Sequence, residues 1–169
     1  MVTTMKKYLF TIMVAVLISG CLHKEEPKDP APSADHMING QVPPMTPTRA
    51  AEQSIALEVI DDDRELLTEK TVRSVGTRAP IHLHPYGGQT CILSGEMTLY
   101  MDGSEPARAV AGNCYFMPSG HRMTGVNSGN TDAVMFDSFV IPTGSDVWTI
   151  VEPGFDSSSE LLSSVRKPK

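Results

Sequence analysis

The most constraining feature of the sequence is a series of short apolar segments, each bounded by turn residues. Between residues 51 and 152 these segments are three to ten residues long, and none continues as a long apolar stripe with helical spacing. The turn at Asp102-Gly103 is typical of a tight hairpin, because both of its central residues need positive φ. Around ten strands at this regular spacing predict an all-β fold, either a closed barrel or two stacked sheets, and not a parallel α/β sheet.

The strands are expected at 54–60, 66–75, 81–84, 90–93, 97–101, 108–110, 114–117, 123–126, 133–141 and 147–151. Short helical turns are expected only near 50–55 and 158–165. The acidic run 61–63 is expected to be an exposed turn, since it lacks the distributed oxygen ligands of a calcium loop.

The start of the chain has the order of a secretory signal. A lysine pair at positions 6 and 7 precedes an apolar run over 8–18, which is far shorter than the roughly 20 residues of a spanning helix. Residues 18–21, Ile-Ser-Gly-Cys, resemble the bacterial lipobox, in which the cysteine receives a diacylglyceryl group and becomes the new N-terminus. The resemblance implies a signal peptide over 1–20, a lipid on Cys21 and an outer-membrane lipoprotein that faces the periplasm. The alternative is a soluble secreted protein in which Cys21 carries no lipid.

Residues 21–50 are expected to form a flexible tether. They contain six prolines among polar and charged residues, and such a segment buries too little apolar surface to offset its ordering entropy. His23 and His36 are then simply solvated tether residues. An ordered N-terminal arm is the alternative. The remaining chain divides into one barrel domain over 51–152 and a C-terminal tail over 153–169.

The charge of the chain excludes one class of partner. The formal net charge is −6, and removal of residues 1–20 leaves 149 residues with 12 basic and 20 acidic side chains, a net charge of −8. The basic surface of a nucleic-acid-binding protein is therefore not expected. Because anionic membranes repel such a chain, membrane attachment would depend on the lipid anchor at Cys21.

Two histidines in the middle of the domain have the spacing of a chelate. His82 and His84 are separated by one residue, so on an extended strand both imidazoles point to the same face. Gln89 follows across the turn at 85–88, whose two glycines allow the chain to fold back tightly. We expect Gln89 to offer its carbonyl oxygen to the same point.

The region from Gly76 to Asn127 resembles the two sequence motifs of the cupins. Their first motif combines a glycine, His-x-His, a glutamate and a second glycine, and its counterparts here are Gly76, His82, His84, Gln89 and Gly95. Their second motif combines a glycine, Pro-x-Gly, a histidine and an asparagine, with counterparts at Gly112, Pro118, Gly120 and Asn127. The resemblance implies a single-domain cupin barrel, also described as a double-stranded β-helix or jelly roll.

Two positions depart from the cupin pattern. Gln89 replaces the glutamate, and Met123 stands at the position of the second-motif histidine, with His121 two residues earlier. A thioether is a soft ligand that suits hard divalent ions poorly. We expect one divalent transition metal (Mn, Fe, Ni or Zn) on His82, His84 and Gln89, with His121, Met123 or water completing the shell. The alternatives are a metal-independent pocket whose histidines bind a polar ligand or each other, and a purely structural pair.

The resemblance also implies a range of functions. Cupins of this size include dioxygenases, isomerases, lyases and decarboxylases that act on small oxygenated compounds, as well as binding modules without a reaction. We therefore expect a lipid-anchored envelope protein that binds or transforms a small oxygenated compound at its metal. The alternative is a non-catalytic small-molecule-binding or interaction lipoprotein with a degenerate metal site. No catalytic residue is identified, and a homodimer is compatible with the resemblance.

The cysteines and one arginine leave alternatives open. Cys91 lies two residues after Gln89 and is expected to share its inward face, whereas Cys114 lies on a later strand. Three alternatives remain for the two cysteines: they form a disulfide, both are buried thiols, or Cys91 binds the metal. Arg78 is expected in solvent at a strand end, with binding of an anionic ligand at the cavity mouth as the alternative.

Overall fold

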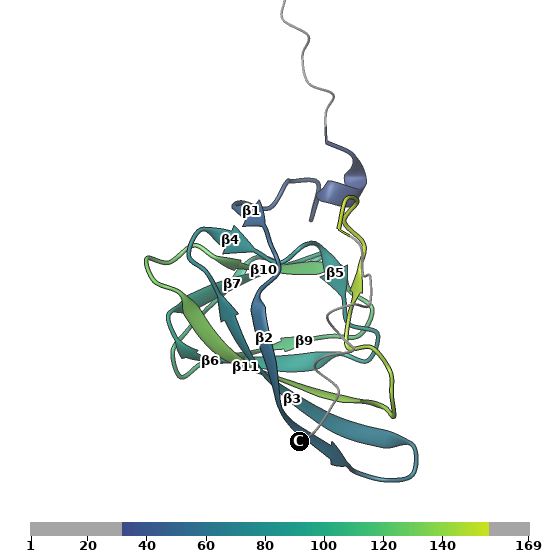
Figure 1. The fold of residues 1–169 in the computed structure, drawn as a ribbon. Coiled ribbons are helices and arrows are strands. Elements are labelled where there is room, and N and C mark those ends of the chain that lie inside the picture. Colours follow the sequence, from purple (N-terminus) through teal and green to yellow (C-terminus); the bar gives the residue numbers. More distant parts are fainter. Residues whose placement is uncertain (1–31, 156–169) are drawn as a thin grey trace, which may run out of the picture. The chain divides into compact units, whose positions relative to one another are not determined.

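The computed structural model describes residues 32–155, which fold into two facing β-sheets (Figure 1). The strands of the first sheet are β1 (Thr46–Pro47), β4 (Thr77–Arg78), β5 (His82–Leu83), β7 (Glu96–Met101), β8 (Ala107–Val110), β10 (Met123–Asn127) and β12 (Thr149–Ile150). The strands of the second sheet are β2 (Ala51–Val59), β3 (Arg64–Arg73), β6 (Gly88–Ser94), β9 (Cys114–Met117) and β11 (Ala133–Pro142). A short 3-10 helix, η1 (Ala34–His36), precedes them.

The topology confirms the expected double-sheet β architecture. The first sheet has the order β1-β4-β10-β5-β12, with β7 paired to β10 and β8 paired to β7, and the second has the order β2-β3-β11-β6-β9. The acidic run 61–63 is the exposed turn between β2 and β3, as expected. The helical turn expected near 50–55 is wrong, because residues 51–54 pair with β3 in an antiparallel ladder that overrides local preference. Residues 156–169 lie outside the described part of the chain.

The core lies between the sheets in two apolar clusters. One contains Leu99, Met117, Met123, Phe139, Ile141 and Val147, and the other contains Ile92, Met97, Ala109, Ala133 and Met135. Strand β11 supplies both clusters through its odd-numbered residues, since successive side chains of a strand point to opposite faces. Asp137 has the same parity, so a carboxylate lies on the core face of a central strand.

Residues 32–50 differ from the expected tether. The side-chain amide of Asn39 donates hydrogen bonds to the carbonyl oxygens of Met101 (3.1 Å) and Ser104 (2.9 Å), and β1 pairs in parallel with β4. The ordered-arm alternative therefore holds for this stretch. Composition could not show it, because the arm is held by hydrogen bonds to turns and strand edges and by the burial of only two apolar residues, Ile38 and Pro43. Within residues 32–155 no helix has the length and apolar character needed to cross a membrane.

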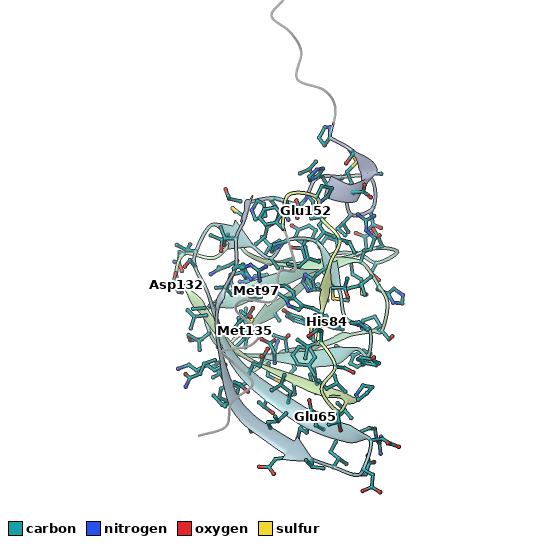
Figure 2. The ribbon with its side chains drawn as sticks, turned by 45° about the vertical axis from the view of Figure 1, so that its right-hand side comes forward. Glu65, His84, Met97, Asp132, Met135 and Glu152 are labelled. Carbon is teal, nitrogen blue, oxygen red and sulfur yellow. A yellow bond between two sulfur atoms is a disulfide. The ribbon has the colours of Figure 1, made fainter. Side chains whose placement is uncertain are left out.

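Arg78 is buried, contrary to both sequence-based expectations. It is 2% exposed and forms two contacts of 2.7 Å with the carboxylate of Glu152, which also accepts the backbone N–H of Ile81 at 2.7 Å. The chain after β12 returns to β4 and brings together residues 74 positions apart (Figure 2). His36, expected in solvent, is half-buried with Nδ1 3.4 Å from the same carboxylate. Glu152 thus joins η1, β4 and the loop before β5.

Candidate metal and ligand site

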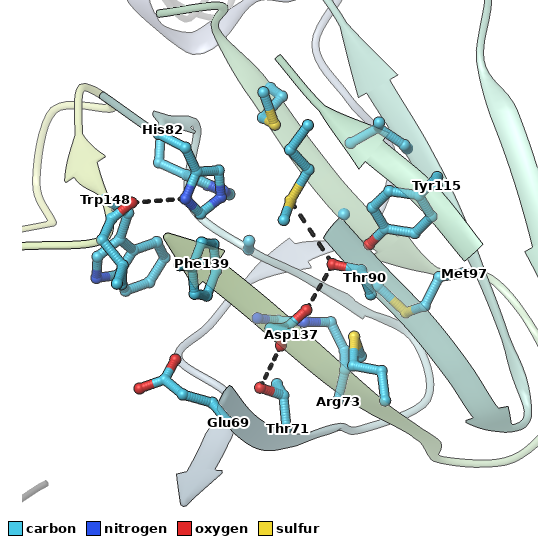
Figure 3. Close-up of a pocket in the computed structure, with 18 of the residues that line it drawn as sticks. Glu69, Thr71, Arg73, His82, Thr90, Met97, Tyr115, Asp137, Phe139 and Trp148 are labelled. Atoms are coloured by element: carbon cyan, nitrogen blue, oxygen red, sulfur yellow. Dashed lines mark hydrogen bonds between the residues drawn. The ribbon is translucent and has the colours of Figure 1, made fainter. Parts of the chain in front are cut away.

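A cavity of about 80 Å³ lies between the two sheets. Its walls include His82, His84 and Met123 from the first sheet and its loops, with Thr90 and Asp137 from the second sheet (Figure 3). Trp148 and Phe139 complete the wall beside the histidines. The cavity therefore combines a histidine end, which is mostly apolar, with a carboxylate end.

The two histidines meet inside this cavity. His82 is 6% exposed and His84 is 5% exposed, and their Nε2 atoms are 3.2 Å apart. The Nδ1 atom of His82 lies 2.8 Å from the carbonyl oxygen of Pro80, and that of His84 lies 2.7 Å from the carbonyl oxygen of Val147. Because a carbonyl oxygen only accepts, these contacts assign the ring proton to Nδ1 in both residues. Both Nε2 lone pairs then point to the same place.

Burial keeps the two rings neutral. Desolvation lowers the pKa of His82 to about 3, with His84 and Arg73 acting in the same direction and the hydrogen bond to Pro80 opposing them. Desolvation likewise lowers the pKa of His84 to about 4, against the hydrogen bond to Val147. At neutral pH no proton is therefore shared between the two Nε2 atoms, and their lone pairs are left without a donor.

Aromatic contacts hold both rings in place. The ring of His82 meets the indole of Trp148 edge-on at a centroid distance of 5.0 Å, and the ring of His84 stacks on Phe139 at 5.1 Å. Each imidazole is thus fixed by one backbone hydrogen bond and one aromatic neighbour. The histidine pair is preorganised and needs no rearrangement to receive a ligand.

Gln89 is not brought to the histidines. The tight turn before β6 starts this strand at Gly88, so Thr90 and Ile92 point inward and Gln89 points to the exposed outer face. A side chain at Gly88 would meet the ring of Phe139 at 2.5 Å, which confirms that this parity faces the core. The amide of Gln89 instead lies 3.6 Å from the sulfur of Cys91. The expected position of Gln89 differs by one residue from an inward-facing position of β6. A shift of one residue moves a side chain to the opposite face of a strand.

The two candidates for the position of the second-motif histidine are placed differently. His121 is exposed and precedes β10, with Nδ1 3.0 Å from the carbonyl oxygen of Ser119, and it does not line the cavity. Met123 has no exposed surface, lines the cavity and is the cross-strand partner of His82. Among the other ligand candidates, Gln89, His121 and Met123, only Met123 lines the cavity that contains His82 and His84.

The histidine pair meets the geometric requirement for a shared metal ion, but the rest of the expected ligand set is absent. Metal–imidazole bonds are about 2.0–2.1 Å long, so two donors to one ion lie at most about 4.2 Å apart, and the Nε2 separation satisfies this limit. Metal-binding histidines also commonly donate their second N–H to a carbonyl oxygen. Within residues 32–155, however, no three side chains of His, Cys, Asp or Glu are grouped to hold an ion.

The opposite end of the cavity holds a carboxylate that the sequence analysis missed. The hydroxyls of Thr71 and Thr90 donate to the two oxygens of Asp137 at 2.6 and 2.5 Å (Figure 3). Burial raises the pKa of Asp137, while these hydrogen bonds and Arg73 oppose the shift. One signal in the sequence could have revealed this carboxylate. In the segment 133–141 the odd-numbered residues are otherwise apolar, and Asp137 stands among them.

Arg73 and Tyr115 surround this carboxylate. Both are lining residues, and Arg73 donates to the carbonyl oxygen of Thr48 at 2.9 Å. Burial lowers the pKa of Arg73, although Glu52, Tyr115 and Asp137 oppose the shift. Burial and Asp137 raise the pKa of Tyr115, which therefore keeps its proton. This end of the cavity offers both donors and acceptors to a polar ligand.

Cys91 and Cys114 form a disulfide between β6 and β9. They are directly opposite each other in the antiparallel register, with Cα atoms 4.0 Å apart. Cys91 shares the parity of Gln89, but that parity is the outer one, so the expected inward face is wrong and a role as metal ligand is excluded. Of the three alternatives for the cysteines, the structure contains the disulfide. Cys21 and His23 lie outside the described residues.

Comparison with known families matches the central part of the chain. Residues 72–142 match the cupin domain family. The two-sheet fold agrees with the single cupin barrel that the sequence resemblance implied. The two histidines and Met123 all lie within the matched region.

One solved structure has a similar fold, and two others are similar to a lesser degree. The DMSP lyase DddQ from Ruegeria pomeroyi DSS-3 is similar with a TM-score of 0.52 and 21% identity, over 64% of this chain and 54% of the lyase. A protein with a double-stranded beta-helix domain from Klebsiella pneumoniae subsp. pneumoniae MGH 78578 gives 0.44 and 20%, over 59% and 80% of the two chains. Oxalate decarboxylase from Lactobacillus farciminis gives 0.46 and 14%, over 51% and 26%. No curated protein matches the sequence. At these identities the likeness extends to the fold and not to the reaction.

Proposed function

We propose that this protein is a lipid-anchored envelope cupin that holds one transition-metal ion on His82 and His84 and binds a small oxygenated compound beside it. The observation that supports the proposal is the convergence of two Nε2 lone pairs, 3.2 Å apart, inside a cavity. Each ring is held in the metal-binding tautomer by a backbone carbonyl oxygen. A bound metal would act as a Lewis acid toward a carbonyl or enolate oxygen, or would activate oxygen.

The other cavity residues suit an oxygenated ligand. A carbonyl or carboxylate oxygen would lie toward the histidine end, and a hydroxyl of the same molecule would donate to Asp137 or accept from Arg73. Trp148 and Phe139 exclude water from the histidine end, which strengthens polar interactions there. If the protein is an enzyme, the reaction is then of the dioxygenase, isomerase or lyase type.

The envelope location is supported by two features. A disulfide between Cys91 and Cys114 suits an oxidising compartment such as the periplasm. The lipobox resemblance of residues 18–21 supplies the anchor through Cys21, since the acidic chain would not bind an anionic membrane by charge. Labelling with a radioactive fatty acid tests the anchor, and the label should disappear in Cys21→Ala.

Elemental analysis of the full-length protein, purified in detergent after loading with Mn, Fe, Ni and Zn in turn, tests the metal site. We expect about one ion per chain in the wild type and in His121→Ala, which changes an exposed histidine outside the cavity. His82→Ala and His84→Ala should each lose the ion. Absence of stoichiometric metal from the loaded wild type, or its retention in His82→Ala, would contradict the proposal.

A second candidate function is a non-catalytic binding or interaction lipoprotein with a metal-independent pocket. It is favoured by the incomplete ligand set, because Gln89 points away from the cavity and Met123 replaces a histidine. The two candidates differ in their dependence on the histidines. A panel of small oxygenated compounds should show His82-dependent binding or turnover under the first function, and binding unchanged by His82→Ala under the second.

A further inference from the structure

Met123 brings a thioether to the cavity from the strand that pairs with His82. Met123 opens β10 directly opposite His82, and paired residues on neighbouring strands project from the same face with Cβ atoms about 4.5–5.5 Å apart. The same face carries the two imidazoles into the cavity that Met123 also lines. Since no carboxylate or third histidine joins the pair within residues 32–155, the thioether is the protein donor available to a third coordination position.

The position of Met123 is firmly fixed. Strand β10 is buried along its whole length and pairs with β4, β5 and β7, so Met123 lies between His82 and Met101. The hydroxyl of the next residue, Thr124, donates to the carbonyl oxygen of Ala79 at 2.6 Å and ties β10 to the chain before β5. Met123 and the histidines are therefore held on one rigid frame.

The charge of an ion determines the free-energy cost of placing it in this part of the cavity. Each imidazole carries its proton on Nδ1 against a carbonyl oxygen and is neutral like the thioether, and Leu99, Met117 and Phe139 pack around Met123. The cost of moving an ion into such a poorly solvated place scales with the square of its charge, so a divalent ion costs about four times as much as a monovalent one. Because no carboxylate is grouped with the two histidines in the described part of the chain, nothing there compensates the second charge, and a monovalent ion is favoured.

We propose that His82, His84 and Met123 form a site selective for a soft monovalent ion, Cu(I) or its redox-inert analogue Ag(I), over hard divalent ions. Thioether ligands select Cu(I), and imidazole also suits copper. This inference rests on the proposed function in one respect, that the two histidines hold a metal. It ranks Cu(I) above the expected Mn, Fe, Ni or Zn in affinity, because a soft ion matches the donors that the cavity presents.

The test is a titration of the full-length protein in detergent and chloride-free buffer with Ag(I), and separately with Mn(II) and Zn(II). We expect one Ag(I) per wild-type chain and tighter binding of Ag(I) than of either divalent ion. Met123→Leu should weaken Ag(I) binding by at least about 10-fold, since even outer-shell partners of metal ligands change affinity by 10–100-fold. Met97→Leu is the matched control, because Met97 is equally buried and lines the same cavity but packs in the other apolar cluster (Figure 3).

Two further measurements cover the case in which Met123→Leu does not fold. X-ray absorption of the wild type loaded with Cu(I) should show one sulfur scatterer with two nitrogen scatterers. Met123→His, which installs the residue of the cupin motif, should shift preference from Ag(I) toward Zn(II).

The outcomes separate this inference from the function on which it rests. If His82→Ala and His84→Ala bind every ion as the wild type does, both proposals are overturned. If these variants lose Zn(II) and Mn(II) while Met123→Leu leaves Ag(I) binding unchanged, or if no sulfur scatterer is found, the metal site stands and only its selectivity for a soft ion is overturned.

Discussion

The Nε2 atoms of His82 and His84 face each other at 3.2 Å although neither carries a proton. Both ring protons are on Nδ1, held by the carbonyl oxygens of Pro80 and Val147. Pro80 precedes β5 and Val147 precedes β12, so two separate parts of the first sheet fix the tautomers. The close approach of two lone pairs costs free energy, and a shared cation would remove that cost.

The first prediction concerns the pH dependence of stability. The pKa values of His82 and His84 are lowered to about 3 and about 4, whereas in the unfolded chain both are near the ordinary 6.5. Below about pH 6.5 the unfolded state binds protons that the folded state does not, so the free energy of unfolding should fall as the pH is lowered, by about 1.4 kcal/mol per histidine per pH unit, until each folded pKa is reached.

Urea unfolding of the metal-free protein at a series of pH values between 7 and 4 measures this dependence. The double variant His82→Gln, His84→Gln removes both titrating groups and should show a much shallower slope. The control variant is His121→Gln, which changes an exposed histidine outside the cavity. Equal slopes in the wild type and the double variant would contradict the prediction.

The second prediction concerns the buried ion pair. Glu152→Ala leaves the Arg78 guanidinium buried without its partner, and removal of one member of such a pair costs about 3–5 kcal/mol. The matched control is Asp61→Ala, which breaks the exposed pair between Asp61 and Arg64 and should lower the free energy of unfolding far less, because solvent screens such a pair. Urea midpoints of the three proteins check the difference, and similar losses in the two variants would refute it.

The fold could be predicted from the sequence because turn residues and strand periodicity are local signals. The segment 114–117 became β9 without a shift of either end, and Met123 begins β10 as expected. The face of each strand was harder to predict. Gln89 and Cys91 point outward because β6 begins at Gly88, and that boundary depends on a turn whose conformation is fixed by packing against Phe139.

The contacts that were missed join residues far apart in the sequence. Arg78 looked like a strand-end arginine because its partner, Glu152, lies 74 positions away and reaches it only after β12 pairs with β5. Asp137 likewise depends on threonines of two other strands, Thr71 of β3 and Thr90 of β6. Spacing along one strand can predict a histidine pair, but it carries no information on which strands surround it.

The third prediction concerns the disulfide. Cys91 and Cys114 are 23 residues apart, and a crosslink that closes a loop of this length contributes about 3 kcal/mol by restricting the unfolded chain. Cys91→Ser, Cys114→Ser should therefore lower the free energy of unfolding by about this amount. Because the pair lies on the outer face of the second sheet, binding of metal at the histidines should not change, which a metal titration of the same variant checks. A change in metal affinity at full folding would contradict the placement of Cys91.

The last prediction concerns Asp137, whose titration acts in the opposite sense to that of the histidines. Burial raises its pKa above the ordinary 3.8, so the folded state holds the proton to a higher pH than the unfolded state does. The contribution of the protonated acid to stability is complete below about pH 3.8 and is lost as the pH rises through the folded pKa.

Asp137→Asn, which keeps the shape and an acceptor for Thr71 and Thr90, should gain stability relative to the wild type as the pH rises through the folded pKa of Asp137. Above that pH the difference in stability should level off. Urea unfolding at matched pH values gives the difference. Asp132→Asn, which changes an exposed aspartate outside the cavity, is the control variant. A difference between Asp137→Asn and the wild type that does not vary with pH would contradict the prediction.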